Sequence, residues 1–218
     1  MGDASNGAEL AIVAQLAREP VPGHCKTRLR PALSAKQAAA LHEALLEYMV
    51  ASLASSEHYH YQLWIDGDPA APVFQRCLER GVSELAAQTE GDLGQRMAYI
   101  ANACLMGAPR VVLLGSDAPA IDREYLMRAL DGLQAVDAVI GPALDGGYVL
   151  LGLRRFDARL FQGIEWGGER VLAQTMKVLE SLGWSYILLQ PLADIDRPED
   201  LRLLPDALKL SLPQNLTV

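Results

Sequence analysis

The sequence lacks the features that mark membrane proteins, disulfide-stabilised proteins and general nucleic-acid binders. No apolar run approaches the roughly 20 residues of a membrane-spanning helix. Cys25, Cys77 and Cys104 are far apart and form no CxxC pair, so neither a zinc site nor a disulfide framework is indicated. The 27 acidic residues outnumber the 19 lysines and arginines, and the net charge of −8 argues against a phosphate-backbone binder. These absences predict a cytoplasmic protein with reduced thiols.

Two familiar phosphate-binding loops are also missing behind the first apolar run, residues 10–16. The stretch PVPGHCKTRLRP, residues 20–31, contains no GxGxxG pattern. Cys25 occupies the position where a P-loop needs a glycine directly before Lys26. A dinucleotide-binding turn and a P-loop are therefore both excluded.

The same stretch carries a cluster of basic residues that is unexpected in an acidic protein. A tight turn at Pro22 and Gly23 precedes Lys26, Thr27 and Arg28. Cationic side chains and a hydroxyl group at this place could hold phosphate oxygens. The alternative interpretation is a solvated basic loop with exposed side chains.

Apolar, β-branched runs alternate with helical patterns, which favours a single α/β domain with a mixed, mostly parallel sheet in a three-layer α/β/α sandwich. Strands are expected at 10–16, 61–65, 111–114, 137–141, 148–153 and 186–190, and helices at 34–54, 69–80, 93–106, 122–134 and 168–182. Ser34 with Gln37 forms a capping-box pattern, and Asp68 and Asp122 are expected N-caps. We expect residues 1–8 to be a disordered tail, residues 9–205 the domain, and residues 206–218 an arm or tail.

Acidic residues follow several of the predicted strands, where open α/β sheets bind ligands. Asp117 comes directly after VVLLG, although an Asx-turn would also explain it. Asp194 and Asp196 share one face of an extended segment before RPEDL, which could equally be a plain helix start. Asp117 and Asp196 would supply the carboxylate pair that Mg²⁺ often uses together with substrate phosphates.

A glycine-rich turn precedes the strand predicted at 148–153. Asp145, Gly146 and Gly147 allow the backbone to adopt positive φ angles and to approach a ligand closely. A simple hairpin turn is the alternative, and it implies that the next strand runs antiparallel.

Six segments, in order, resemble the signature blocks of one family: PVPGHCKTRL, QTEGDLGQRM, LLGSDAPAI, GPALDGGYVLLGL, IEWGGERVL and DIDRPEDL. The family is the first type of the radical-SAM and selenodomain-associated transferases, in the nucleotide-diphospho-sugar transferase superfamily with the glycosyltransferase A (GT-A) fold. The resemblance extends from about residue 10 to residue 205. Relatives include guanylyltransferases that act on molybdenum cofactor and on 2-phospholactate.

The resemblance implies roles for particular residues. The implied nucleotide-binding residues are Pro22, Gly23, Lys26, Thr27, Arg28, Gly91, Asp92 and Arg96. The implied acceptor-binding residues are Asp145, Gly146, Gly147, Tyr148 and Trp166. Asp117 and Asp196 would hold Mg²⁺ or Mn²⁺, and Asp117, Lys26 and Asp145 are the catalytic candidates. Two features depart from the family: Gly167 and Gly168 follow Trp166 where the family has serine or threonine after the tryptophan, and no Asp-x-Asp surrounds Asp117.

The sequence therefore predicts a metal-dependent transferase with a nucleotide-sugar or nucleoside triphosphate donor and a small-molecule acceptor, and glycosyltransferase-like transfer is the first choice. The alternatives are a guanylyltransferase-like nucleotidyltransferase for a small phosphorylated acceptor, a non-catalytic nucleotide-binding protein, and a purely structural domain. Neither nucleic acid nor a membrane is an expected partner. The four histidines, among them His42, are expected to lie outside the site, and most of them to be ordinary surface residues.

Overall fold

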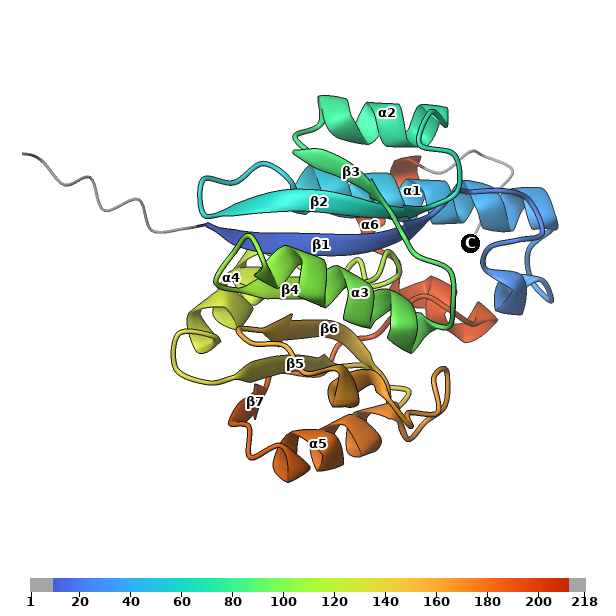
Figure 1. Ribbon diagram of the computed structural model, residues 1–218. Coiled ribbons are helices and arrows are strands. Elements are labelled where there is room, and N and C mark those ends of the chain that lie inside the picture. Colours follow the sequence, from blue (N-terminus) through green and yellow to red (C-terminus); the bar gives the residue numbers. More distant parts are fainter. Residues whose placement is uncertain (1–9, 212–218) are drawn as a thin grey trace, which may run out of the picture.

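The computed structural model describes residues 10–211 as one domain, in which helices cover both faces of a central sheet (Figure 1). The strands are β1 Ala11–Arg18, β2 Tyr59–Asp66, β3 Glu84–Ala87, β4 Val111–Leu114, β5 Ala138–Pro142, β6 Tyr148–Leu153 and β7 Tyr186–Leu188. The α-helices are α1 Ala35–Leu53, α2 Pro72–Glu79, α3 Leu93–Leu105, α4 Arg123–Gly132, α5 Val171–Ser181 and α6 Asp206–Ser211. The 3₁₀ helices are η1 Thr27–Leu29, η2 Ala158–Phe161 and η3 Pro198–Leu203.

The strand order places the switch point of the sheet between β1 and β4. Within residues 10–211 the sheet has seven strands in the order β3-β2-β1-β4-β6-β5-β7. β1 is parallel to both β2 and β4, so the chain fills first one side of β1 and then the other. Among the described strands only β6 is antiparallel to its neighbours, as the Asp-Gly-Gly turn predicts. The carboxyl ends of β1, β4 and β5 therefore lie at the same end of the sheet.

Alternate residues of each strand enter two separate cores, as the three-layer prediction requires. Val13 of β1 belongs to the core beneath α1, α2 and α4, together with Met49 and Leu126. Its neighbour Ile12 belongs to the core beneath α3 and α5, together with Ile100. Figure 1 shows the strands side by side in one sheet, from β3 at one edge to β7 at the other, with α3 in front of the sheet.

Two of the three expected helix caps are present. The Ser34 hydroxyl accepts a hydrogen bond from the backbone N–H of Gln37 and completes a capping box, and Asp122 caps α4. The prediction for Asp68 was wrong, because α2 begins only at Pro72. Proline suits the first helical turn, where its missing N–H costs nothing, and Asp68 makes a local turn before it.

The residue pattern of β3 does not predict a strand. Its four residues, ELAA, include no β-branched or aromatic side chain, and none of them is fully buried. β3 forms by pairing with β2 at the edge of the sheet, so its conformation depends on the neighbouring strand. β7 ends at Leu188, two residues earlier than predicted.

The expected tail of residues 1–8 and residues 212–218 of the expected arm lie outside the described residues. The described part of the arm forms α6, which packs against α1 through the buried Leu208. Cys25, Cys77 and Cys104 are buried free thiols. None of the described helices has the length and apolar character to cross a membrane.

A buried carboxylate ties the start of β5 to the segment before β7. The Asp137 side chain is 12% exposed and accepts hydrogen bonds from the backbone N–H and the hydroxyl of Ser185, at 3.0 and 2.9 Å, and from Arg154 Nε at 3.3 Å. Burial raises the pKa of Asp137, but the donors of Ser185 and Arg154 outweigh burial and lower the pKa below its usual value.

Asp137→Ala should lower the free energy of unfolding by about 1.5–3 kcal/mol, because it removes a buried charged acceptor that receives hydrogen bonds from Ser185 and Arg154. Urea denaturation would measure this loss, and the exposed Asp131→Ala, with an expected change within about 0.5 kcal/mol, is the matched control. A lowered folded-state pKa means that the contribution is complete above the usual pKa of about 3.9 and is lost as the pH falls through the folded value. The difference between wild type and variant should therefore shrink below about pH 4, and a difference that persists there would contradict the assignment.

Candidate active site at the switch point of the sheet

A cleft of about 620 Å³ opens at the carboxyl end of the sheet. Its walls come from the ends of β1 and β4, the loop of residues 24–28, the start of α3, the hairpin between β5 and β6, and the segments around Trp166 and Asp194. Open α/β sheets bind ligands at such switch points, and this volume is within the usual range for small-molecule sites of about 300–1,000 Å³. The cleft therefore lies where the predicted site residues were expected to meet.

Lys26 is buried, in contrast to the exposed side chain of the solvated-loop interpretation. Its side chain is 3% exposed, and its Nζ lies 2.6 Å from Asp117 Oδ1. The same ammonium group donates a hydrogen bond to the backbone carbonyl of Ile195. Lys26 also has a left-handed backbone conformation, with φ 48°, which is uncommon for a residue other than glycine and is often found at functional sites. Lys26 thus joins the loop after β1 to the segments after β4 and β7.

Asp117 offers one carboxylate oxygen to the cleft and keeps the other one buried. Oδ1 is fully buried beside Lys26, whereas the side chain as a whole is 44% exposed, so the exposed surface belongs mainly to Oδ2. Burial alone would raise the pKa of Asp117, but the charge of Lys26 outweighs it and lowers the pKa. The preceding Ser116 fixes the turn, because its hydroxyl donates to the carbonyl of Leu16 at 2.8 Å.

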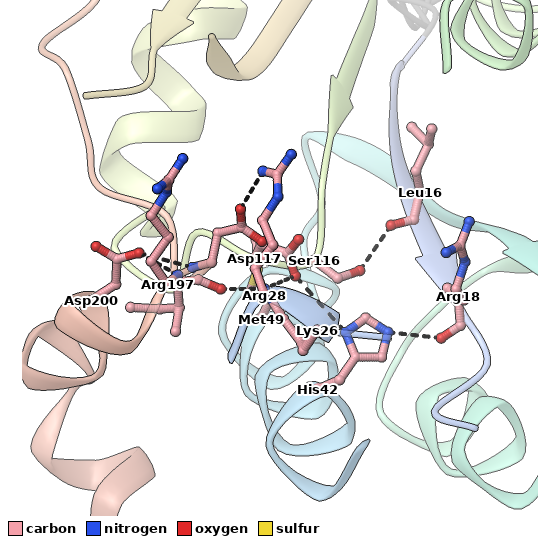
Figure 2. A network of polar contacts seen from close by, with 12 residues as sticks. Leu16, Arg18, Lys26, Arg28, His42, Met49, Ser116, Asp117, Arg197 and Asp200 are labelled. Atoms are coloured by element: carbon pink, nitrogen blue, oxygen red, sulfur yellow. Dashed lines mark hydrogen bonds and ion pairs between the residues drawn. The ribbon is translucent and has the colours of Figure 1, made fainter. Parts of the chain in front are cut away.

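His42 belongs to the site, so the expectation that it lies outside the site was wrong. Its Nε2 lies 3.0 Å from the carbonyl of Arg18, and its Nδ1 lies 3.9 Å from Asp117 Oδ1. Figure 2 shows Lys26 and His42 close to Asp117. A carbonyl oxygen only accepts hydrogen bonds, so Nε2 carries a proton. Burial lowers the pKa of His42, and Asp117 only partly offsets that effect.

The helical pattern could have indicated that His42 is buried. His42 lies four residues after Ala38 and four before Leu46, on the apolar stripe of α1. A polar side chain on such a stripe needs a buried partner, and here the partners are the ends of β1 and β4.

Arg28 and Asp196 form a second ion pair, 2.6 Å long, at the mouth of the cleft. Arg28 is 55% exposed, and its hydrogen bond to Asp196 raises the pKa of the guanidinium group. Asp200 accepts hydrogen bonds from the backbone N–H groups of Asp196 and Arg197 and so fixes this turn (Figure 2). Asp117 and Asp196 therefore each have a basic partner of their own, Lys26 and Arg28.

Asp194 is a site residue that the prediction left out. It lines the cleft and makes no ion pair within residues 10–211. Burial, followed by the charges of Asp145, Asp117 and Asp196, raises the pKa of Asp194 to about 6. The spacing of Asp194 and Asp196, two residues apart, was the available signal. Only the fold shows that Asp145 lies near enough to interact with them.

Arginine side chains form the lip of the cleft at the end of β1 and the start of α3. Arg96 Nη1 and Arg18 Nε lie 2.7 and 3.0 Å from the same oxygen of Asp66. Burial raises the pKa of Asp66, but both arginines lower it below the usual value. Two guanidinium groups therefore share one carboxylate, which leaves this lip with an excess positive charge.

Gly91 and Asp92 shape this lip in different ways. Gly91 has φ 118°, and its carbonyl accepts a hydrogen bond from Arg96 Nε at 3.1 Å. Asp92 caps α3 through a capping box with Gln95 and does not line the cleft. The structure therefore accounts for Asp92 as a helix cap.

The hairpin between β5 and β6 forms the remaining wall. Asp145 Oδ1 accepts a hydrogen bond from the backbone N–H of Gly147 at 3.0 Å. Gly146 has φ 92°, and a Cβ atom at this position would lie 2.1 Å from the carbonyl oxygen of Glu169. Only glycine therefore fits there. The rings of Tyr148 and Trp166 meet edge to face, with their centroids 6.3 Å apart.

The structure brings most of the predicted site residues to the cleft. The residues that line it are Lys26, Thr27, Arg28, Gly91, Arg96, Asp117, Asp145, Gly147, Tyr148, Trp166 and Asp196. Four do not line it, namely Pro22, Gly23, Asp92 and Gly146. Gly167 and Gly168 also line the cleft, and Gly167 has φ 81°, a conformation that glycine adopts more readily than serine or threonine.

Comparisons with known proteins agree with this geometry. The model of the family described as "Uncharacterized protein conserved in bacteria (DUF2064)" matches residues 49–168. The 2-phospho-L-lactate guanylyltransferase of Methanothermobacter thermautotrophicus is 32% identical over 185 residues, which cover 82% of this chain and 77% of that protein.

Two solved structures show the same fold. One, from Desulfovibrio desulfuricans G20, is provisionally named a nucleotide-diphospho-sugar transferase; it is 33% identical, with a TM-score of 0.79 over 92% of this chain and 88% of that one. The 4-diphosphocytidyl-2C-methyl-D-erythritol synthase of Anaerococcus prevotii DSM 20548 is 11% identical, with a TM-score of 0.55 over 90% and 96% of the two chains. This second match bears on the fold alone.

The predictions of a transferase and of a nucleotide-diphospho-sugar transferase fold are both confirmed. The family match spans more than half of the 218 residues and includes Asp117 and Asp145. The chain therefore belongs to the DUF2064 family.

Proposed function

We propose that the protein is a nucleotidyltransferase that moves a nucleoside monophosphate from a nucleoside triphosphate to a small phosphorylated acceptor. The main support is the 32% identity to a guanylyltransferase over most of both chains. This was the alternative interpretation of the sequence, and it is better supported than glycosyltransferase-like transfer. Guanosine triphosphate is accordingly the first donor to test, and a phosphorylated hydroxy acid is the first acceptor.

The charges around the cleft suit these two anionic substrates. Arg18, Arg28 and Arg96 line the cleft beside the loop after β1 and the start of α3. An acidic protein needs local cations of this kind to bind a triphosphate. Asp145 and the backbone around Gly147 would face the acceptor.

A divalent cation fits the carboxylates of the cleft. Asp117 presents one oxygen, and Asp194 lies close enough to Asp117, Asp145 and Asp196 that their charges raise its pKa. The described residues contain no preformed group of three or more ligand side chains, which suits Mg²⁺ or Mn²⁺ held by one or two carboxylates together with substrate phosphates. Asp117 with Asp196 remains the predicted pair, and Asp194 is a further candidate ligand. A bound metal would offset the negative charge of the phosphates.

In the proposed reaction an acceptor phosphate oxygen forms a bond to the α-phosphorus, the bond from that phosphorus to the pyrophosphate group breaks, and pyrophosphate leaves. Lys26 and His42 would hold Asp117 in place, because both already contact its buried oxygen. Arg28 would turn from Asp196 to the triphosphate, which frees Asp196. Catalysis would then rest on positioning and on electrostatic stabilisation of the leaving group.

Several finer assignments belong to the same proposal. The six sequence blocks support membership of the radical-SAM-associated type of transferase. The free thiols agree with the expected cytoplasmic location. Residues 9–205 would form the transferase domain.

The released product distinguishes the two kinds of transfer. With Mg²⁺, guanosine triphosphate and 2-phospholactate, a nucleotidyltransferase releases pyrophosphate, whereas a glycosyltransferase given a nucleotide sugar releases a nucleoside diphosphate. We expect pyrophosphate release that depends on the acceptor. A nucleotide at 100 times its Kd should also stabilise the protein by about 2.7 kcal/mol in a thermal-shift panel. Nucleoside diphosphate release from a nucleotide sugar, without pyrophosphate release from any triphosphate, would overturn the proposal.

Substitution of Lys26 and substitution of Arg28, two basic residues of one loop, should have different effects on stability and on nucleotide binding. Lys26→Ala leaves the buried oxygen of Asp117 without its cation and should cost about 1–3 kcal/mol of stability, less than for a fully buried pair because Asp117 is 44% exposed. Arg28→Ala removes an exposed partner and should change stability by no more than about 1 kcal/mol while it weakens nucleotide binding. Urea denaturation and calorimetric titration with guanosine triphosphate measure the two effects. Equal stability losses would refute this division of roles.

Asp117→Asn should abolish the Mg²⁺-dependent part of nucleotide binding and should also lower stability, because Lys26 loses its charged partner. Asp122→Asn is the matched control, since asparagine is equally good at the N-cap of α4 and position 122 is not part of the cleft lining. Titrations with and without Mg²⁺ would detect the loss, and metal-dependent binding by Asp117→Asn would exclude Asp117 as a ligand.

A further inference from the structure

A third hydrophobic cluster, separate from the two cores of the sheet, includes residues from the segments that carry Arg28, Asp194 and Asp196. It joins three segments: the loop after β1, helix α1 and the segment after β7. Its buried members are Leu29, Leu33, Ala38, Leu41, Leu45, Ile195, Leu201, Leu204 and Leu208. None of them belongs to the clusters under the two faces of the sheet. This cluster, which we call the arm cluster, therefore stabilises the loops rather than the strands.

Two members of the arm cluster are sequence neighbours of charged site residues. Leu29 is fully buried directly after Arg28, and Ile195, 1% exposed, lies between Asp194 and Asp196. The burial of each apolar side chain fixes the backbone that carries its charged neighbours. The position of the site residues thus depends on how the arm cluster packs.

Ile195 also connects the arm cluster to the centre of the site through its backbone. Its N–H donates to the carbonyl of Asp117 at 2.8 Å, and its carbonyl accepts from the ammonium group of Lys26. A shift of Ile195 would therefore move a partner of both Lys26 and Asp117.

The C-terminal arm, taken from here on as residues 198–211 so that it includes η3, contributes to this cluster from two very short helices. η3 and α6 have six residues each, and helices of this length are not stable in water without tertiary packing. Leu201, Leu204 and Leu208 are buried in the arm cluster, and α6 packs on α1 (Figure 1). In contrast, Leu210 on the same helix is 87% exposed. The arm is therefore docked through a few leucines.

We infer that Leu204 and Leu208 are positioning residues for the cleft. By docking the C-terminal arm they hold two segments in place, namely the loop that carries Lys26 and Arg28 and the segment that carries Asp194 and Asp196. The effect on substrates rests on the proposed function, whereas the effect on the two loops does not. Local opening of the arm would loosen both loops and leave the strands intact, because stability differs between parts of one domain.

Hydrogen exchange of the full-length protein without ligand tests the positioning directly. Leu208→Ala creates a cavity in the arm cluster, and Leu210→Ala on the same helix is the matched control. We expect the amides of residues 27–33 and 194–197 to exchange about tenfold faster in Leu208→Ala, while those of β1 and β4 keep their protection. Leu210→Ala should behave as the wild type does. Leu208→Met, which conserves volume, should restore protection.

A second measurement connects the arm to binding. Leu208→Ala should raise the KM for guanosine triphosphate with little change in kcat at saturation, because the loops can still close on a bound nucleotide. Absence of nucleotide binding by the wild type would overturn the proposed function, and the exchange comparison would still decide the positioning role.

Two outcomes would overturn the positioning role. Faster exchange confined to α6 would mean that the arm docks without affecting the cleft. Uniformly faster exchange in β1 and β4 would mean that Leu208 is an ordinary core residue.

Discussion

The ion pair between Lys26 and Asp117 is the contact on which the cleft depends. It joins the loop after β1 to the turn after β4. These two strands flank the switch point of the sheet. The same ammonium group reaches the carbonyl of Ile195, so a third segment is tied to the same place. Burying a lysine is costly unless it is paired and hydrogen-bonded, and both conditions are met here. The left-handed conformation of Lys26 is a further cost that these contacts offset.

The charges around this pair divide the cleft into two chemically different halves. On one lip, Arg18 and Arg96 both pair with Asp66, so two positive charges face one negative charge. On the other, Asp145 and Asp194 have no lysine or arginine paired with them in the described part of the chain, and the pKa of Asp194 rises to about 6. An anionic substrate and a divalent cation are complementary to these two halves. The arrangement would also allow a protein with a net charge of −8 to bind the triphosphate of the proposed reaction.

In this chain Gly167 and Gly168 follow Trp166, where the family that the sequence resembles has serine or threonine after the tryptophan. Gly167 adopts φ 81°, so the loop before α5 has a backbone conformation that suits glycine. This departure from the sequence pattern is therefore accommodated by the local geometry, and Trp166 still packs against Tyr148 in the wall of the cleft. The departure gives no reason to regard the cleft as defective.

The sequence by itself determined the layered fold, because the periodicity of its apolar residues and the caps Ser34 and Asp122 act over only a few neighbouring residues. It also determined that Lys26, Asp117, Asp145 and Asp196 would meet, since parallel strands bring their carboxyl ends to one end of a sheet. It could not determine which charges pair, because Lys26 and Asp117 are 91 positions apart and their ion pair depends on burial. For the same reason His42, Asp194 and β3 were missed. Their roles come from neighbours that only the tertiary structure brings close.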